Sequence, residues 1–217
     1  MPRAWGDGGE AMVEAAALAL DYPEVAVVEE ETLAMQTLAV ASDLPARPLL
    51  LGGCCCTHIG AVEGLAARHG RVSVLWLDAH GDLNTSETSP SGNEWGMPLR
   101  MLLDRGTLAA ADVVVWGVRN LDPPEKEFIA AVGIGDEPED LLARADAVYV
   151  ALDCDVFDPD ELAVFMPEPD GPSLDDLERL LATVRESDKL VGVGLTGLAP
   201  DPANVEKLHR LTAALGY

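Results

Sequence analysis

The chain has little positive charge, few aromatic residues and no long apolar run. Its 217 residues include 14 Lys and Arg against 38 Asp and Glu, which gives a formal net charge of −24, and aromatic residues make up only 5%. Nucleic acids and anionic membrane surfaces would repel such a chain, so neither is an expected partner. No window approaches the roughly 18 consecutive apolar residues of a membrane-spanning helix. A cation is a more natural ligand, although a saline habitat or a GC-rich genome also explains an acidic, lysine-poor composition.

The chain also lacks the marks of a secreted protein. Residues 1–10 do not have the basic-then-apolar order of a secretory signal, so we expect a cytoplasmic protein. Four cysteines, three of them contiguous at Cys54, Cys55 and Cys56, do not form the dispersed pattern of a disulfide framework. We therefore expect free thiols. The length and the 48% hydrophobic content suit one core, and we predict a single domain over residues 1–217.

Short apolar, β-branched runs alternate with amphipathic segments, which is typical of an α/β fold with a mostly parallel sheet. Several runs are apolar on both faces, as buried parallel strands are. The expected strands are Pro48–Leu51, Val72–Leu77, Val113–Trp116, Ala147–Leu152 and Leu190–Leu195. The expected helices are Glu10–Leu20, Thr57–Arg68, Pro98–Asp104, Glu125–Val132, Pro138–Arg144, Leu174–Arg185 and Ala203–Leu215. Residues 28–37 fit either a helix or a strand, and residues 86–96 and 157–173 are expected to be long ordered loops.

Two acidic clusters directly follow expected strands. One holds Asp78, His80 and Asp82, and the other holds Asp153 and Asp155. In an extended chain, residues two apart point to the same face, so the members of each cluster would face one side. Ligands of open parallel sheets gather at the carboxyl ends of the strands, where both clusters fall. A single D-x-D is most simply a turn or a helix cap. Two such clusters indicate a binuclear metal site, because cations would offset the repulsion among four carboxylates.

These motifs and others nearby resemble the arginase/agmatinase (ureohydrolase) family. The resemblance runs from about Leu49 to Pro200 and is carried by Gly52-Gly53, Leu77–Thr85, Ser91–Asn93, Gly117–Pro123, Asp153–Asp155 and Asp158-Pro159. It implies a three-layer α/β/α fold with a mostly parallel central sheet, two manganese ions and a bridging hydroxide. The implied activity is hydrolysis of a C–N bond in an amino-acid-derived guanidino compound, either arginine or a substituted analogue such as N-hydroxyarginine.

The resemblance also assigns roles by motif position. Asp82 and His80 would be catalytic, with Asp82 able to take the proton of the hydroxide. The implied metal ligands are Cys55, Asp78, His80, Asp82, Asp153 and Asp155. Arginases recognise the α-carboxylate and α-amino groups of their substrate at positions that correspond here to Asn84, Ser91, Asn93 and Asp122. These four favour an amino-acid substrate over a simple amine such as agmatine. The alternative for them is ordinary loop hydrogen bonding, since Asn, Ser and Asp favour turns.

Three positions depart from the family pattern. Cys55 stands where a histidine normally binds the more exposed metal, Trp95 where arginases place a proton-shuttling histidine, and Gly197 where the family has a guanidinium-binding glutamate. A thiolate is a soft ligand, so zinc, iron or cobalt could replace manganese. The alternative for Cys55 is a small buried residue at a strand-to-helix turn. Without that glutamate, a full positive charge loses its partner, so we expect a substrate with a less basic head than arginine.

The same departures keep a second function open, that of a catalytically impaired arginase-fold protein that retains metal in a structural or regulatory role. For the enzyme, the expected partner is a small guanidino-type molecule. Nothing before Pro48 resembles the family's usual first strand and glycine-rich motif. An uncovered sheet edge would need a loop or another subunit to cover it, so a homo-oligomer is a further expectation.

Overall fold

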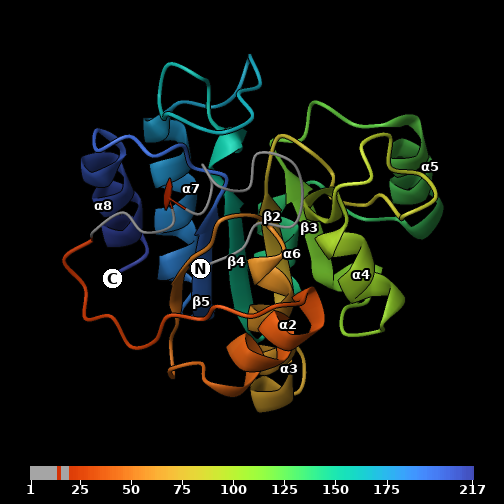
Figure 1. The fold of residues 1–217 in the computed structure, drawn as a ribbon, viewed down its shortest axis with the longest axis horizontal. Helices are drawn as coiled ribbons and strands as arrows, with labels where there is room; N and C mark the ends of the chain where they lie inside the picture. Colours follow the sequence, from red (N-terminus) through yellow and green to blue (C-terminus); the bar gives the residue numbers. More distant parts are fainter. Residues whose placement is uncertain (1–13, 16–19) are drawn as a thin grey trace.

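A parallel sheet forms the centre of the structure, with the strand order β1–β5–β4–β2–β3 in the described residues (Figure 1). The computed structural model describes residues 14–15 and 20–217. The strands are β1 (Leu49–Leu51), β2 (Ser73–Leu77), β3 (Val113–Trp116), β4 (Val148–Asp153) and β5 (Leu190–Thr196), and all their pairings are parallel. The predicted parallel sheet is confirmed, and each expected strand agrees with its observed bounds to within one residue at either end.

Helices occupy most of the expected positions. They are α2 (Leu33–Ser42), α3 (Thr57–His69), α4 (Pro98–Asp104), α5 (Pro123–Val132), α6 (Pro138–Arg144), α7 (Leu174–Glu186) and α8 (Asn204–Ala214), with short 3-10 turns η1 (Glu94–Gly96), η2 (Ala110–Asp112) and η3 (Cys154–Val156). The expected helix over residues 10–20 falls mostly outside the described residues, of which Glu14 and Ala15 are helical. No helix in the described ranges is long and apolar enough to cross a membrane.

Two helix starts differ from the sequence expectation for local reasons. The ambiguous segment 28–37 is irregular until Thr32, whose hydroxyl accepts a hydrogen bond from the amide of Met35 and so begins α2. Helix α5 begins earlier than expected because two prolines, Pro123 and Pro124, occupy its first turn, where no amide donor is needed.

The sheet separates two apolar layers, which confirms the three-layer arrangement. Along β2, Val74 and Trp76 belong to the same buried cluster as the apolar residues of α3 and α4. The alternate residues Leu75 and Leu77 belong to a second cluster with α7 and α8. Helix α7 packs beside α8, and α2 packs beside α3 (Figure 1). Burial on both faces explains why the strands read as continuous apolar runs.

The register of the strands places their carboxyl ends at one edge. Leu77 pairs with Trp116 on one side and with Leu152 on the other, and Leu152 pairs in turn with Leu195. The segments that follow β2, β3, β4 and β5 therefore begin at the same edge of the sheet. In an open parallel sheet this is the edge where ligands bind.

Candidate metal centre

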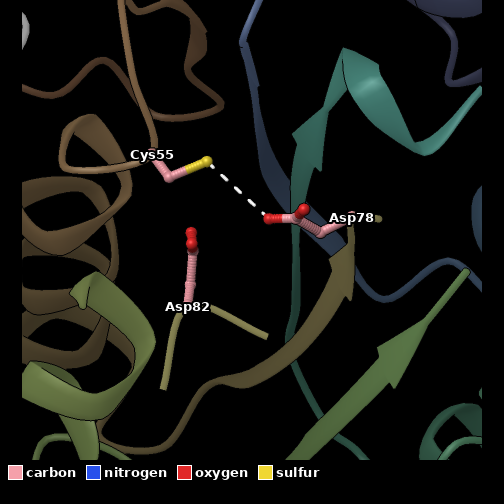
Figure 2. A group of neighbouring side chains, drawn as sticks. All are labelled: Cys55, Asp78 and Asp82. Atoms are coloured by element: carbon pink, nitrogen blue, oxygen red, sulfur yellow. Dashed lines mark hydrogen bonds between the residues drawn. The ribbon is translucent and has the colours of Figure 1, made fainter. Parts of the chain in front are cut away.

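One group of predicted ligands joins the segments that follow β1 and β2. The ligand atoms of Cys55, Asp78 and Asp82 lie within 4.8 Å of one another, and all three residues are buried. Figure 2 shows these side chains pointing toward one another from separate backbone segments. The Cys55 thiol also donates a hydrogen bond to Asp153 Oδ2 at 2.7 Å, which adds the end of β4 to the group. Segments distant in sequence therefore supply one compact set of donors.

A second group shares Asp78 with the first. The ligand atoms of Asp78, His80 and Asp155 also lie within 4.8 Å of one another. His80 Nδ1 is 3.0 Å from Asp155 Oδ2 and 3.5 Å from Asp78 Oδ1. The amide of Ala79 donates to Asp155 Oδ1 at 3.1 Å and ties the loop after β2 to the turn after β4. Five of the six predicted ligands thus lie in two adjacent groups with one common member, and the sixth, Asp153, adjoins the first group through its hydrogen bond from Cys55.

The backbone brings these side chains together in a way that corrects the sequence reasoning. The clusters do not continue as extended strands: Asp82 has a left-handed φ of 53°, and Asp155 lies in the 3-10 turn η3. Asp78 Oδ1 accepts from the amide of His80 at 2.7 Å, and Asp153 Oδ1 accepts from the amide of Asp155 at 3.0 Å. The first carboxylate of each cluster therefore closes a small turn, and the turns, not strand alternation, direct the side chains inward.

The four carboxyl groups are in an environment that disfavours their charge. Burial, together with repulsion from a neighbouring carboxylate, raises the pKa of Asp153 to about 7 and that of Asp155 to about 6. Burial likewise raises the pKa of Asp78 and, more strongly, that of Asp82. Asp82 Oδ2 is buried and has no hydrogen-bond partner among the described residues. In the same part of the chain, no Lys or Arg side chain forms an ion pair with these carboxylates.

His80 and Cys55 respond to the same concentration of negative charge. Burial alone would lower the pKa of His80, but the carboxylates of Asp155 and Asp78 outweigh it and raise that pKa to about 12. Burial, followed by repulsion from the nearby carboxylates, holds the pKa of the Cys55 thiol well above its usual range. Divalent cations would reverse both effects by displacing the protons. The donor set, the burial and the unpartnered Asp82 oxygen therefore fit two bound metal ions.

Support for the ligands comes partly from Trp76 in β2. Its ring is buried in the core, and its Nε1 also donates to Asp78 Oδ2 at 3.1 Å. The sequence feature that could have indicated this hydrogen bond is the position of Trp76, two residues before Asp78 at the end of a strand. On the other ligand, Thr196 Oγ1 donates to Asp153 Oδ2 at 3.3 Å. Such neighbours orient the oxygens that face a metal.

The remaining cysteines and His58 lie outside both ligand groups. Cys54, Cys56 and Cys154 are buried. His58 is fully buried, shares hydrogen bonds with Tyr149 and Thr196, and has a pKa lowered to about 3 by burial. His58 therefore does not replace the histidine that is missing at position 55.

A cavity of about 230 Å³ opens onto the two ligand groups. Of the four predicted substrate-binding residues, Asn84, Ser91 and Asp122 line it, and Asn93 is not among the lining residues. Asn84 Nδ2 donates to Asp122 Oδ2 at 2.9 Å and so joins the loop after β2 to the loop after β3. Part of their hydrogen bonding is therefore between loops, in line with the alternative role predicted for these residues. The sequence analysis missed Glu125, a buried lining carboxylate that completes a capping box with Asp122. The spacing D-x-x-E at a helix start was its signal.

The other two departures from the family pattern also line this cavity. Trp95 meets Phe165 edge to face, with ring centroids 5.8 Å apart, and the pair forms an aromatic wall. Gly197 lies at the end of β5 with a left-handed φ of 72°. Neither position brings a charged group to the cavity.

The metal-free protein is expected to lose stability as the pH rises from about 4 to about 7. Across this window folded Asp153, with a pKa of about 7 against 3.8, and Asp155, with a pKa of about 6, hold protons that the unfolded chain releases. Folded Asp78 and Asp82, whose pKa values are also raised, act in the same direction, whereas His58, with a pKa lowered to about 3, acts in the opposite one. The four carboxyl groups outnumber His58, so the unfolded state binds fewer protons and the free energy of unfolding falls with rising pH. Because metal competes with these protons, the increase in Tm on adding Mn²⁺ should grow over the same window. Thermal unfolding with and without Mn²⁺ measures this, and a metal effect that is constant with pH would contradict it.

Comparison with known proteins gives a consistent picture. A model of the arginase family matches residues 9–217. The arginases of Bacillus caldovelox and Bacillus subtilis are 39% and 36% identical to this chain over 143 and 142 residues, which is 52% of this chain and 48% of each relative. The chain thus spans about half the length of the curated relatives it matches. The solved arginase of Bacillus caldovelox superposes with a TM-score of 0.82 at 25% identity and covers 100% of this chain and 96% of that chain.

Proposed function

Since the chain belongs to the arginase family, we propose that it is a metal-dependent hydrolase that cleaves a C–N bond of an amino-acid-derived guanidino compound. The observation that carries this proposal is the pair of ligand groups that share Asp78 at the base of a cavity. A small molecule that enters this cavity meets the metal ligands directly. The same cavity is lined by Asn84 and Asp122, whose polar groups suit the amino-acid end of a substrate.

The two groups suggest which residues hold each ion. Cys55, Asp82 and Asp153 would hold one, His80 and Asp155 the other, and Asp78 would contact both. Two bound divalent ions would lower the pKa of a shared water and polarise the group under attack. Asp82 Oδ2, which has no hydrogen-bond partner among the described residues, is the atom to which we assign acceptance of the proton released in the reaction. Trp76 and Thr196 would keep the carboxylates of Asp78 and Asp153 in place.

The cavity favours a substrate with a less basic head than arginine. Gly197 supplies no carboxylate, and Trp95 and Phe165 present aromatic surface. An N-hydroxylated or otherwise substituted guanidine requires less counter-charge than a guanidinium, since it carries less positive charge at neutral pH. We expect such a substrate to be turned over faster than arginine, and agmatine, which lacks the α-carboxylate, to be turned over most slowly.

Elemental analysis of the purified protein, run beside a product screen, tests the proposal. The screen contains arginine, agmatine, guanidinobutyrate and N-hydroxyarginine, with release of urea or hydroxyurea as the readout. Two ions per chain with turnover of at least one amino-acid guanidine are expected. Fewer than one ion per chain with no turnover would refute the proposal, and two ions with no turnover would favour a structural or regulatory role for the metal.

Metal preference is expected to depend on Cys55. As a thiolate, Cys55 would draw the first group toward zinc, iron or cobalt, whereas imidazole leaves manganese competitive. Cys55→His should therefore raise the Mn²⁺ to Zn²⁺ affinity ratio of one site by about 10-fold or more. Competition titrations followed by elemental analysis measure this ratio. Cys154→Ala, which removes another buried thiol beside the ligands, is the matched control and should leave the ratio unchanged.

A further inference from the structure

The imidazole of His80 presents one nitrogen to the ligand group, and its second nitrogen has no hydrogen-bond partner among the described residues. Nδ1 faces Asp155 Oδ2 at 3.0 Å. Nε2 is buried without a hydrogen bond from any described residue, yet it lies 3.4 Å from Glu168 Oε1. An N–H to carboxylate hydrogen bond is normally shorter, at about 2.7–3.2 Å, so a small rotation of the ring or the carboxylate would complete it. Glu168 is thus placed directly behind a predicted metal ligand.

The segment that carries Glu168 is held through both its side chain and its backbone. Asn120 Nδ2 donates to Glu168 Oε1 at 2.7 Å. Prolines at positions 167 and 169 flank the residue and restrict the backbone on both sides. The Arg119 guanidinium donates to the carbonyls of Glu168 and Pro169 at 2.8 and 2.7 Å. The contacts with Asn120 and Arg119 therefore hold this segment in place, although residues 157–173 form no helix or extended strand.

Arg119 also connects this segment to the metal centre. The same guanidinium donates to the carbonyls of Asp155 and Val156 at 2.9 and 3.0 Å, and further to those of Gly117 and Phe157. Among the described residues, every hydrogen bond that the Arg119 side chain donates goes to a backbone carbonyl, so the charge of Arg119 does not neutralise the side chain of Glu168. Arg119 therefore holds both the segment that carries Glu168 and the turn that contains Asp155, and so fixes the distance between Glu168 and His80.

We propose that Glu168 is a positioning residue that accepts the Nε2–H of His80 and so leaves Nδ1 free to bind the second metal ion. A metal-binding histidine usually donates its other N–H to a carboxylate or carbonyl, and loss of that partner weakens metal binding by about 10–100-fold. Arg119 and Asn120 present the carboxylate. The loop that contains Arg119 and Asn120 therefore supports the metal centre through these two residues. The same loop lines the cavity through Asp122. This role rests on the proposed metal centre.

Titration of the metal-free full chain with Mn²⁺, followed by calorimetry and by electron paramagnetic resonance, tests the role. Glu168→Ala is expected to weaken the second binding event by about 10–100-fold while the first changes by less than about twofold. Glu168→Gln, which keeps an acceptor oxygen without charge, should fall between Glu168→Ala and wild type and covers the case in which the alanine variant fails to fold. Asp160→Asn removes an equal charge from an exposed position of the same loop and should bind both ions normally.

Unchanged affinity for both ions in folded Glu168→Ala would overturn the role. Equal weakening by Asp160→Asn would also overturn it, because a general loss of negative charge would then explain the effect. If the wild-type chain binds two ions but turns over no substrate, only the catalytic proposal fails. If the wild-type chain binds a single ion, the proposed metal centre fails, and the role of Glu168 fails with it.

Discussion

Replacing Asp78 with asparagine is expected to abolish tight binding of both metal ions while making the metal-free protein more stable. Asp78 belongs to both ligand groups, so its loss removes a donor from each ion. Without metal, however, its charge is unfavourable in the folded state, because burial and repulsion from Asp153 raise its pKa despite the nearby His80. Asparagine has nearly the same shape, and its amide oxygen can still accept the hydrogen bond that the His80 amide donates to Asp78 Oδ1. The hydrogen bond that Trp76 Nε1 donates to Asp78 Oδ2 is lost, because an amide NH2 group cannot accept it, and we expect the relief of buried charge to outweigh that loss.

The two effects have opposite signs and can be measured separately. Loss of the metal centre should lower kcat/KM by about 10³-fold or more, which corresponds to about 4 kcal/mol of transition-state stabilisation. The metal-free Tm should rise by about 2–4 °C for each kcal/mol gained by a chain of this length. Thermal unfolding in the presence of a chelator, together with turnover in saturating Mn²⁺, gives both values. A metal-free Asp78→Asn protein that is less stable than wild type would contradict the electrostatic argument.

Asp112→Asn is the matched control for this substitution. Asp112 is also a buried aspartate, but it lies in η2, ahead of β3, and forms an ion pair with Arg71. Since its charge has a partner, its removal should not raise the metal-free Tm. Its distance from the ligand groups, at the opposite end of the strands, should also leave metal binding and turnover unchanged. An increase in stability in both variants would indicate a response to net charge instead of a response to the metal site.

The proximity of the candidate ligands could be predicted from the sequence because it depends on features that are visible locally. Asp78 and Asp153 follow apolar runs that mark buried strands, and a parallel sheet brings the carboxyl ends of its strands together. Residue type and position directly after an expected strand therefore sufficed to predict that they lie near each other. The local geometry could not be predicted in the same way, because the left-handed Asp82 and the 3-10 turn at Asp155 depend on hydrogen bonds made only in the folded chain.

The residues that support the ligands could not be predicted, because their contacts are long-range and their types are ordinary. Glu168 is one of many acidic residues, and only the folded loop places it beside His80 and Asn120. A tryptophan in a buried strand is typical of the core, and the Trp76 ring does pack there. The sequence pattern therefore could not indicate its hydrogen bond to Asp78. Helix α2 shows the same limit, since its capping residue Thr32 follows a segment without clear periodicity.

Gly197→Glu is expected to damage the metal centre instead of creating a guanidinium site. Gly197 has a φ of 72°, and a Cβ atom at this position would lie 1.9 Å from Asp153 Oδ1. The backbone cannot move freely to relieve this contact, because the Gly197 carbonyl accepts a hydrogen bond from the amide of Phe165 at 2.9 Å and the next residue bridges to Val164. Any side chain at position 197 must therefore displace Asp153, a predicted ligand.

Comparison of two alanine substitutions separates this collision from simple backbone strain. Gly106 has nearly the same φ, 71°, but a Cβ there would have no atom within 4 Å. Gly106→Ala should therefore show only the cost of the left-handed conformation, about 1–2 kcal/mol of unfolding free energy, with normal metal binding. Gly197→Ala should exceed that cost and also weaken Mn²⁺ binding by about 10-fold or more, as expected when a ligand is displaced. Equal effects of the two substitutions on stability, with Mn²⁺ affinity retained in Gly197→Ala, would show that position 197 tolerates a side chain. In that case arginine turnover by Gly197→Glu would become the expected result, since the new carboxylate could pair with a guanidinium in the cavity.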